Sequence, residues 1–333
     1  MHHQGAWICD QSLDASEENV GYLAKVAHRH KGRWSRTMGP DNIIAAFEHN
    51  DRVCEIDHYL VPSSRIEKAL AAMQQPFPEL THLRLQKLIS MRRITQVIPA
   101  SFSASFLGGS APRMKYLFLD DIPFPGLPKL LLSATDLTDL HLRNITPSGY
   151  ISSEEMATCL SVLTRLERFT LLFESLPSRP DRKRRRPPPP TRALLPDFTL
   201  FYFKWVGEYL DGLVAEIDAP LLNKVDISFF PRPTFETPQL AEFISRSPNL
   251  TTHDEAHLNF SDSNTDIKLP QSFDGALMLG ISCRKLDQQV SSLAQVCRSS
   301  FPQALVSRVE HLYIDGYWRE CWKDESDEIH SSQ

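Results

Sequence analysis

The sequence predicts an α/β solenoid in which short parallel strands form one curved sheet and helical or irregular connectors form the convex side. Two observations carry this prediction: an apolar template recurs along the chain, and helix-forming segments lie between its copies. Self-similarity at a period of about 20 to 50 residues is the usual signature of a repeat architecture. The composition suits a folded chain, because 41% of the 333 residues are hydrophobic and 23% are charged.

The template is an apolar residue followed by further apolar residues three, five and eight positions later. Its clearest copies are 80–88 (LTHLRLQKL), 114–122 (MKYLFLDDI) and 137–145 (LTDLHLRNI). Weaker copies contain Leu166, Phe169 and Leu171; Leu195, Phe198, Leu200 and Phe203; Leu222, Val225, Ile227 and Phe230; Val309, Leu312, Ile314 and Tyr317; and, with His58 in an apolar position, Val53, Ile56 and Val61. The alternation within each copy indicates a short strand with one buried face.

The spacing of the copies assigns the fold class. Counted from the second apolar position of each copy between 56 and 225, the steps are 27, 34, 23, 29, 29 and 27 residues. Leucine-rich repeats have a period of about 20 to 29 residues, and stacked repeats bury apolar faces that none could bury alone. We therefore expect a leucine-rich-repeat solenoid, or horseshoe, over 41–317. Between 225 and 312 we expect two or three degenerate repeats, near 258–260 and 277–281.

Each strand needs a connector that crosses the other side of the sheet, and six segments have apolar residues at helical spacing. Several begin with a residue type that caps helix N-termini, such as Asp41, Ser63 and Ser152. The expected helices are 41–48, 63–73, 152–163, 208–217, 237–245 and 286–296.

Three segments fall outside this repeat pattern. Residues 1–40 form a polar N-terminal segment, and 318–333 form an acidic C-terminal tail. A basic, proline-rich insert at about 176–194 lies between two of the strands. Its five consecutive cations repel each other and its four prolines cannot continue a helix. The cations are Arg182, Lys183, Arg184, Arg185 and Arg186. The insert is either a solvated loop or a nuclear-import signal or contact for an acidic partner.

Four stretches resemble the fungal F-box/leucine-rich-repeat proteins, and the similarity runs from about residue 20 to the end of the chain. They are 50–57 (NDRVCEID), 122–142 (IPFPGLPKLLLSATDLTDLHL), 147–152 (PSGYIS) and 238–246 (PQLAEFISR). The resemblance implies that the repeats select a protein substrate for a cullin–RING ubiquitin ligase. In that family an N-terminal F-box binds the ligase adaptor. The first forty residues contain no Leu-Pro-x-Glu helix start, so the adaptor is an expected partner only of a longer form that carries an F-box.

Motifs for catalysis, cofactors and metals do not occur. The segment 108–112 (GGSAP) departs from Gly-x-Ser-x-Gly at its last position, and no phosphate-binding glycine loop is present. The segment 262–273 begins like a calcium loop but has Ile267 in the glycine position and Phe273 in place of the bidentate acid. We therefore expect no enzyme activity, no cofactor and no metal.

Other features bear on where the chain works. The six cysteines are scattered without a Cys-x-x-Cys pair, which favours reduced thiols in an intracellular protein. Neither a signal peptide nor an apolar segment of about 18 residues is present. The sequence predicts a cytoplasmic or nuclear protein without membrane contact. Nucleic acid is not an expected partner, because the formal net charge is −5.

The expected functional surface is the concave face of the sheet, where side chains between the buried leucines point. Aromatic residues and Arg, the types that dominate protein interfaces, are frequent among them. The candidate partner-binding residues are His82, Arg84, Tyr116, Phe118, Asp139, His141, Arg168, Thr170, Thr199, Phe201, Lys224, Asp226, His311 and Tyr313. They predict a non-enzymatic protein-interaction module, with substrate recognition for a ubiquitin ligase as its setting. The alternative is a nuclear or nucleic-acid-associated protein that uses the basic run 182–186.

Overall fold

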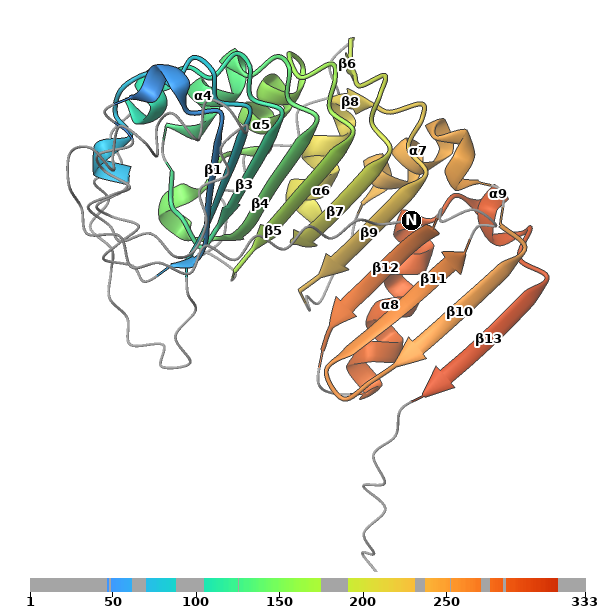
Figure 1. Ribbon diagram of the computed structural model, residues 1–333. Coiled ribbons are helices and arrows are strands. Elements are labelled where there is room, and N and C mark those ends of the chain that lie inside the picture. The colour runs from blue at the N-terminus through green and yellow to red at the C-terminus, as the bar shows by residue number, and fades with distance from the viewer. Residues whose placement is uncertain are drawn as a thin grey trace, which may run out of the picture.

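The computed structural model describes most of the chain between Phe47 and Gly316, and Figure 1 shows its strands side by side in one large sheet. The described residues are 47, 49–61, 70–87, 105–124, 126–174, 191–230, 237–251, 253–270, 276–283 and 286–316. Within them, eleven strands form the large sheet and two short strands form a second one. Helices lie along one side of the large sheet (Figure 1). The fold is therefore mixed α/β.

The large sheet has the strand order β1-β2-β3-β4-β5-β7-β9-β12-β11-β10-β13. The strands are β1 (Glu55–Val61), β2 (His82–Lys87), β3 (Tyr116–Asp120), β4 (Asp139–Ile145), β5 (Arg168–Phe173), β7 (Leu200–Trp205), β9 (Lys224–Phe229), β10 (Glu255–Phe260), β11 (Asn264–Pro270), β12 (Ala276–Ser282) and β13 (His311–Gly316). The small sheet pairs β6 (Ala193–Leu194) with β8 (Ile217–Asp218).

From β1 to β9 each strand of the large sheet pairs in parallel with the next. The pairing aligns the second apolar residue of each template copy, as with Leu83, Leu117 and Leu140 on neighbouring strands. These side chains are fully buried against the helices in one continuous core. Because each buried leucine contributes about 1.5–3 kcal/mol, a row of them holds adjacent strands in a single register.

The helices follow the strands along the chain. They are α4 (Leu127–Ser133), α5 (Ser153–Leu160), α6 (Gly207–Ala215), α7 (Pro238–Arg246), α8 (Leu286–Ser300) and α9 (Gln303–Val306), with 3-10 turns η1 (Asn50–Arg52), η2 (Phe106–Gly109), η3 (Pro147–Gly149) and η4 (Pro248–Leu250). Four of the expected helices correspond to α5, α6, α7 and α8. Ser152 caps α5 as expected, because its side chain accepts a hydrogen bond of 3.1 Å from the Glu155 backbone N–H. Most of the expected helices at 41–48 and 63–73 lies outside the described residues.

The predicted parallel repeats between 225 and 312 are wrong in one respect. The expected segments near 258–260 and 277–281 lie in β10 and β12, but β11 runs between them and is antiparallel to both. The chain passes from β9 through α7 to β10, returns through β11 and β12 to pair with β9, and then continues through α8 to β13 beside β10. Every strand of the large sheet except β11 therefore points the same way.

The predicted register of the copy at 195–203 is also wrong. Phe201, expected on the concave face, pairs with Phe169 and Val225 and is fully buried. Its ring stacks on that of Phe169, with centroids 5.6 Å apart. The template fits this stretch twice, and the fit that starts at Phe198 and ends at Val206 is the one adopted. This register buries more aromatic side chains, so the removal of apolar surface from water stabilises it more than the other register.

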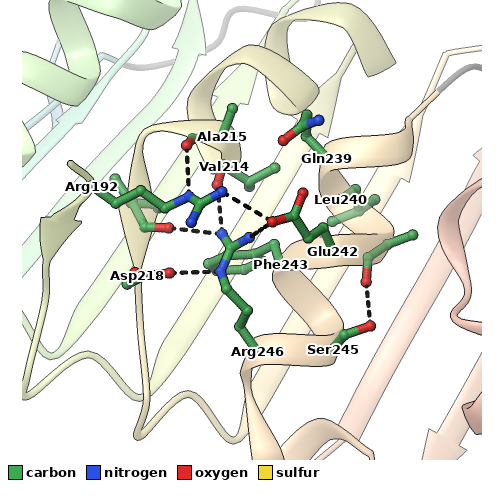
Figure 2. Close-up of polar contacts among 12 residues, drawn as sticks. Arg192, Val214, Ala215, Asp218, Gln239, Leu240, Glu242, Phe243, Ser245 and Arg246 are labelled. Atoms are coloured by element: carbon green, nitrogen blue, oxygen red, sulfur yellow. Dashed lines mark hydrogen bonds and ion pairs between the residues drawn. The ribbon is translucent and has the colours of Figure 1, made fainter. Parts of the chain in front are cut away.

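On the helix side, two arginines join the chain that follows the basic insert to α6 and α7 (Figure 2). Arg192 donates to the Ala215 carbonyl at 3.1 Å and pairs with Glu242 at 3.0 Å. Arg246 pairs with the same carboxylate at 3.0 Å and donates to Asp218 at 2.6 Å. Its guanidinium also donates to the Val214 carbonyl in the last turn of α6, where the helix dipole favours positive charge, and to the Ile217 carbonyl of β8.

Candidate functional site

The side chains that alternate with the buried ones form the second face of the large sheet, which we call the open face. Strand pairing aligns one residue from each of the eleven strands into a continuous line, which we call the central row. The central row consists of Asp57, Arg84, Phe118, His141, Thr170, Tyr202, Asp226, Met278, Lys268, His257 and Tyr313.

Aromatic rings gather on the open face of β2, β3 and β4. The His82 and Tyr116 rings stack in parallel, with centroids 4.1 Å apart and planes inclined by 2°. The His141 ring lies 5.5 Å from Tyr116 and 5.8 Å from Phe118, tilted against both. Such contacts between neighbouring strands add to the stability of the sheet and restrict ring motion. They form an ordered aromatic platform.

Two guanidinium groups cover the ring at the centre of this platform. Arg84 on β2 and Arg143 on β4 lie 4.9 Å and 5.3 Å from the centroid of the Phe118 ring. Phe118 is only 6% exposed as a result. A cation over an aromatic face is stabilised by the ring quadrupole, and a guanidinium presents several donors in a planar fork. Each of these two guanidinium groups could donate to a carboxylate of a partner that approaches this part of the open face.

The histidine of the platform is held in its neutral form. Burial lowers the pKa of His141 to about 4, although the nearby Asp139 carboxylate acts in the opposite direction. His141 Nδ1 lies 2.9 Å from the Thr170 hydroxyl, and Asp139 forms an ion pair with Arg168. At neutral pH the positive charge of this part of the open face therefore comes from its arginines.

A second polar group lies on β7, β9 and the strands beyond. The Lys224 ammonium lies 5.8 Å from the Tyr202 ring centroid. Burial raises the pKa of Asp226 to about 6; Lys224 opposes this shift and Asp266 adds to it. Asp266 accepts a hydrogen bond of 2.8 Å from the Asn259 side chain. This part of the open face presents partly buried carboxylates beside a cation.

Most predicted binding residues lie on the open face. They are His82, Arg84, Tyr116, Phe118, Asp139, His141, Arg168, Thr170, Lys224, Asp226, His311 and Tyr313. Asp139 and Thr170 are nonetheless buried, because they pair with neighbouring side chains of the sheet. They support the shape of the surface more than they offer contacts to a partner.

Two predicted binding residues are corrected. Phe201 is part of the core, because β7 adopts the register in which Phe201 pairs with the buried Phe169. Thr199 precedes β7, and its hydroxyl donates at 3.2 Å to the carbonyl of Glu167, the residue just before β5. Leu200 and Tyr202 lie on the open face in the positions that the sequence analysis assigned to Thr199 and Phe201. Sequence reasoning also missed Asp57, Arg143, Tyr202, His257, Lys268 and Met278, which the alternation identifies once the register of each strand is known.

The described residues outside the open face offer no second site of this kind for a metal ion or a ligand. No three His, Cys, Asp or Glu side chains among them lie close enough to hold a metal ion. A cavity of about 20 Å³ lies between sheet and helices, with Leu119, Met156 and Tyr209 in its wall, and such a volume holds about one water. Burial raises the pKa of the Cys159 and Cys297 thiols to about 11, so both are protonated at neutral pH.

None of the described helices has the length and apolar composition that crossing a bilayer requires. The basic run 182–186 and the segments 1–40 and 318–333 lie outside the described residues.

No family model, no curated protein and no solved structure matches the chain. What the chain binds therefore has to be inferred from its own residues.

Proposed function

We propose that the chain is a non-enzymatic protein-interaction module whose open face binds a segment of a partner protein. The observation that carries this proposal is the central row, which sets aromatic, cationic and acidic side chains in one line across all eleven strands. Aromatic residues and Arg are enriched at the energetic centres of protein interfaces. A long row of this kind suits an extended ligand more than a small molecule.

The finer fold assignment that goes with this function is a leucine-rich-repeat solenoid with a curved sheet. It is supported by the recurring apolar template and by the parallel pairing of β1 to β9. Solenoids of this class use the extended face formed by their strands for binding. The expected setting is substrate recognition for an F-box-like ubiquitin ligase. The resemblance of 122–142 and 238–246 to that family supports it.

The charges on the open face suggest what the partner segment contains. Arg84 and Arg143 suit an acidic side chain, since both guanidinium groups lie beside the Phe118 ring. Asp226 and Asp266, farther along the sheet, suit a cation. The complementary segment thus has an acidic residue over β2–β4 and a basic one over β9–β11. Such complementarity fixes direction and register more than it adds affinity.

The test uses a photo-crosslinking amino acid placed on each side of the sheet in living cells. On the open face it replaces Tyr202, and on the helix side it replaces Leu132, which is half-exposed on α4. We expect one protein to be captured from position 202 and not from position 132. Capture from both positions alike, or from neither, would contradict the proposal. Binding of the purified ligase adaptor to a longer form of the chain tests the ubiquitin setting separately.

A further inference from the structure

The last strand of the large sheet, β13, has an unusual surface. Its alternate residues Leu312 and Ile314 pair with Ala256 and Leu258 of β10, on the side of the sheet that carries the core. Yet Leu312 is 56% exposed and Ile314 is 65% exposed. Two large aliphatic side chains in core positions thus remain in water. Each therefore forgoes much of the free energy that full burial would supply.

Among the described residues, the backbone of β13 pairs on one side only, with β10. His311 N–H donates to the Asp254 carbonyl at 3.1 Å, on the side of β10. In a parallel sheet, the N–H and C=O groups of one residue both point toward the same neighbouring strand, and those of the next residue both point to the opposite side. His311, Tyr313 and Asp315 therefore direct these groups toward β10, and Leu312 and Ile314 direct theirs away from it. The strand contains neither Lys nor Pro, the residues that commonly block pairing at a sheet edge.

We propose that a second copy of this chain pairs with this edge, β13 against β13, antiparallel about a two-fold axis that passes beside Tyr313. In this register Leu312 lies opposite the partner's Ile314, and His311 lies opposite the partner's Asp315. Tyr313 lies opposite its own copy. The pairing brings apolar side chains together on the core side and complementary polar ones together on the open face.

The outward backbone groups select this register. In an antiparallel pair, residues that exchange both hydrogen bonds lie directly opposite each other. Leu312 and Ile314 must therefore face residues of the partner subunit whose backbone groups also point away from β10. Moving the axis to Ile314 keeps that rule but sets Leu312 against the partner's Gly316 and Tyr313 against the partner's Asp315. Only the axis beside Tyr313 matches apolar with apolar and basic with acidic side chains, and such matches stabilise cross-strand pairs.

The assembly has a consequence for the open face. A two-fold axis perpendicular to the sheet places the open faces of both copies on the same side, so that they become one surface. An isologous interface of this kind is closed and cannot propagate into a fibre. Two partner segments could then be bound side by side, which raises avidity without any new contact to either one.

Single cysteines introduced into the full-length chain test the register. The paired Tyr313 positions do not exchange hydrogen bonds, so their Cα atoms lie about 4.5 Å apart, within the range of about 4.4–6.8 Å that a disulfide spans. Residues 311 and 315 each lie about 14 Å from their own copy, four residues along the strand. Under mild oxidation Tyr313→Cys should give at least about tenfold more covalent dimer than His311→Cys or Asp315→Cys. These variants carry the same native cysteines. Equal cross-linking at the three positions, or none, would overturn the register.

Sedimentation equilibrium of the native chain tests the dimer itself. We expect a concentration-dependent dimer whose affinity falls at least tenfold in Leu312→Lys, because each of the two lysines would face the partner's Ile314 in place of an apolar side chain. The matched control is Val290→Lys, at a half-exposed valine of α8, which should leave the dimer unchanged. A native chain that stays monomeric overturns the proposal. A dimer that is insensitive to Leu312→Lys overturns it as well.

Discussion

Neighbouring residues of one strand have opposite roles, which makes single substitutions informative. Leu140 is fully buried in the core, whereas His141, the next residue of β4, lies on the open face. Leu140→Asp places an unpaired carboxylate among apolar side chains and should cost several kcal/mol of unfolding free energy. His141→Ala loses a contact with Thr170 and should cost about 1 kcal/mol. Denaturant titration of both variants measures the difference, and equal costs would contradict the assigned faces.

Asp226 should make the stability of the chain depend on pH. Its pKa is about 6 in the folded chain, above the ordinary value of 3.8, so the folded state binds the proton more tightly than the unfolded state does. The contribution of this group is therefore most favourable below about pH 4 and is lost as the pH rises through about 6. We expect Asp226→Asn to melt at a higher temperature than the native chain at pH 8. The advantage should vanish near pH 4, and a difference that does not change with pH would contradict the assignment.

At the scale of elements, the two arginines on the helix side secure the contact between α6 and α7. Arg246 reaches two backbone carbonyls, Asp218 and Glu242 (Figure 2). Because charge-assisted hydrogen bonds contribute about 1.5–3 kcal/mol, Arg246→Ala should lower the unfolding free energy by about 2 kcal/mol. The control is Arg165→Ala, whose ion pair with Asp136 is exposed and contributes less than about 1 kcal/mol. Equal losses in the two variants would show that the network does not stabilise this contact.

The sequence predicted most strands well because their copies of the template are unambiguous. At 80–88 and 137–145 all four apolar positions are filled in one register only. The stretch from Leu195 to Val206 fits in two registers, and alternation alone cannot choose between them. Packing against Phe169 on the next strand decides it, and that contact is invisible in the sequence. The two fits start three residues apart, at Leu195 and Phe198, and the choice between them decides whether Phe201 lies on the binding surface or in the core.

Strand direction and short helices were harder to predict. Alternation of apolar residues is the same in parallel and antiparallel strands, so the pattern gave no sign that β11 reverses the chain direction. The whole of β11 also lies in 262–273, a segment whose first residues resemble a calcium loop and not a strand. Helix α4 has only seven residues, which is too short for a clear helical period. The polar contacts of the open face depend on strand neighbours and follow only from the pairing.

The whole molecule combines two ways of building one sheet. From β1 to β9 each strand adds to the last in parallel, and beyond β9 the antiparallel strand β11 lies between two parallel neighbours. The central row crosses this change without interruption, because each strand pair keeps its facing residues in register. The open face is therefore one surface from β1 to β13, long enough for an extended protein segment.

The central claim is that a partner protein binds this open face and not the helix side. The most direct measurement is the affinity of the captured partner for Arg143→Ala, Tyr202→Ala and Leu132→Ala, by calorimetry on variants with unchanged melting temperatures. We expect the two open-face substitutions to raise the dissociation constant about tenfold or more, which corresponds to about 1.4 kcal/mol, and Leu132→Ala to leave it unchanged. Unchanged affinity for both open-face variants, or an equal loss in Leu132→Ala, would contradict the claim.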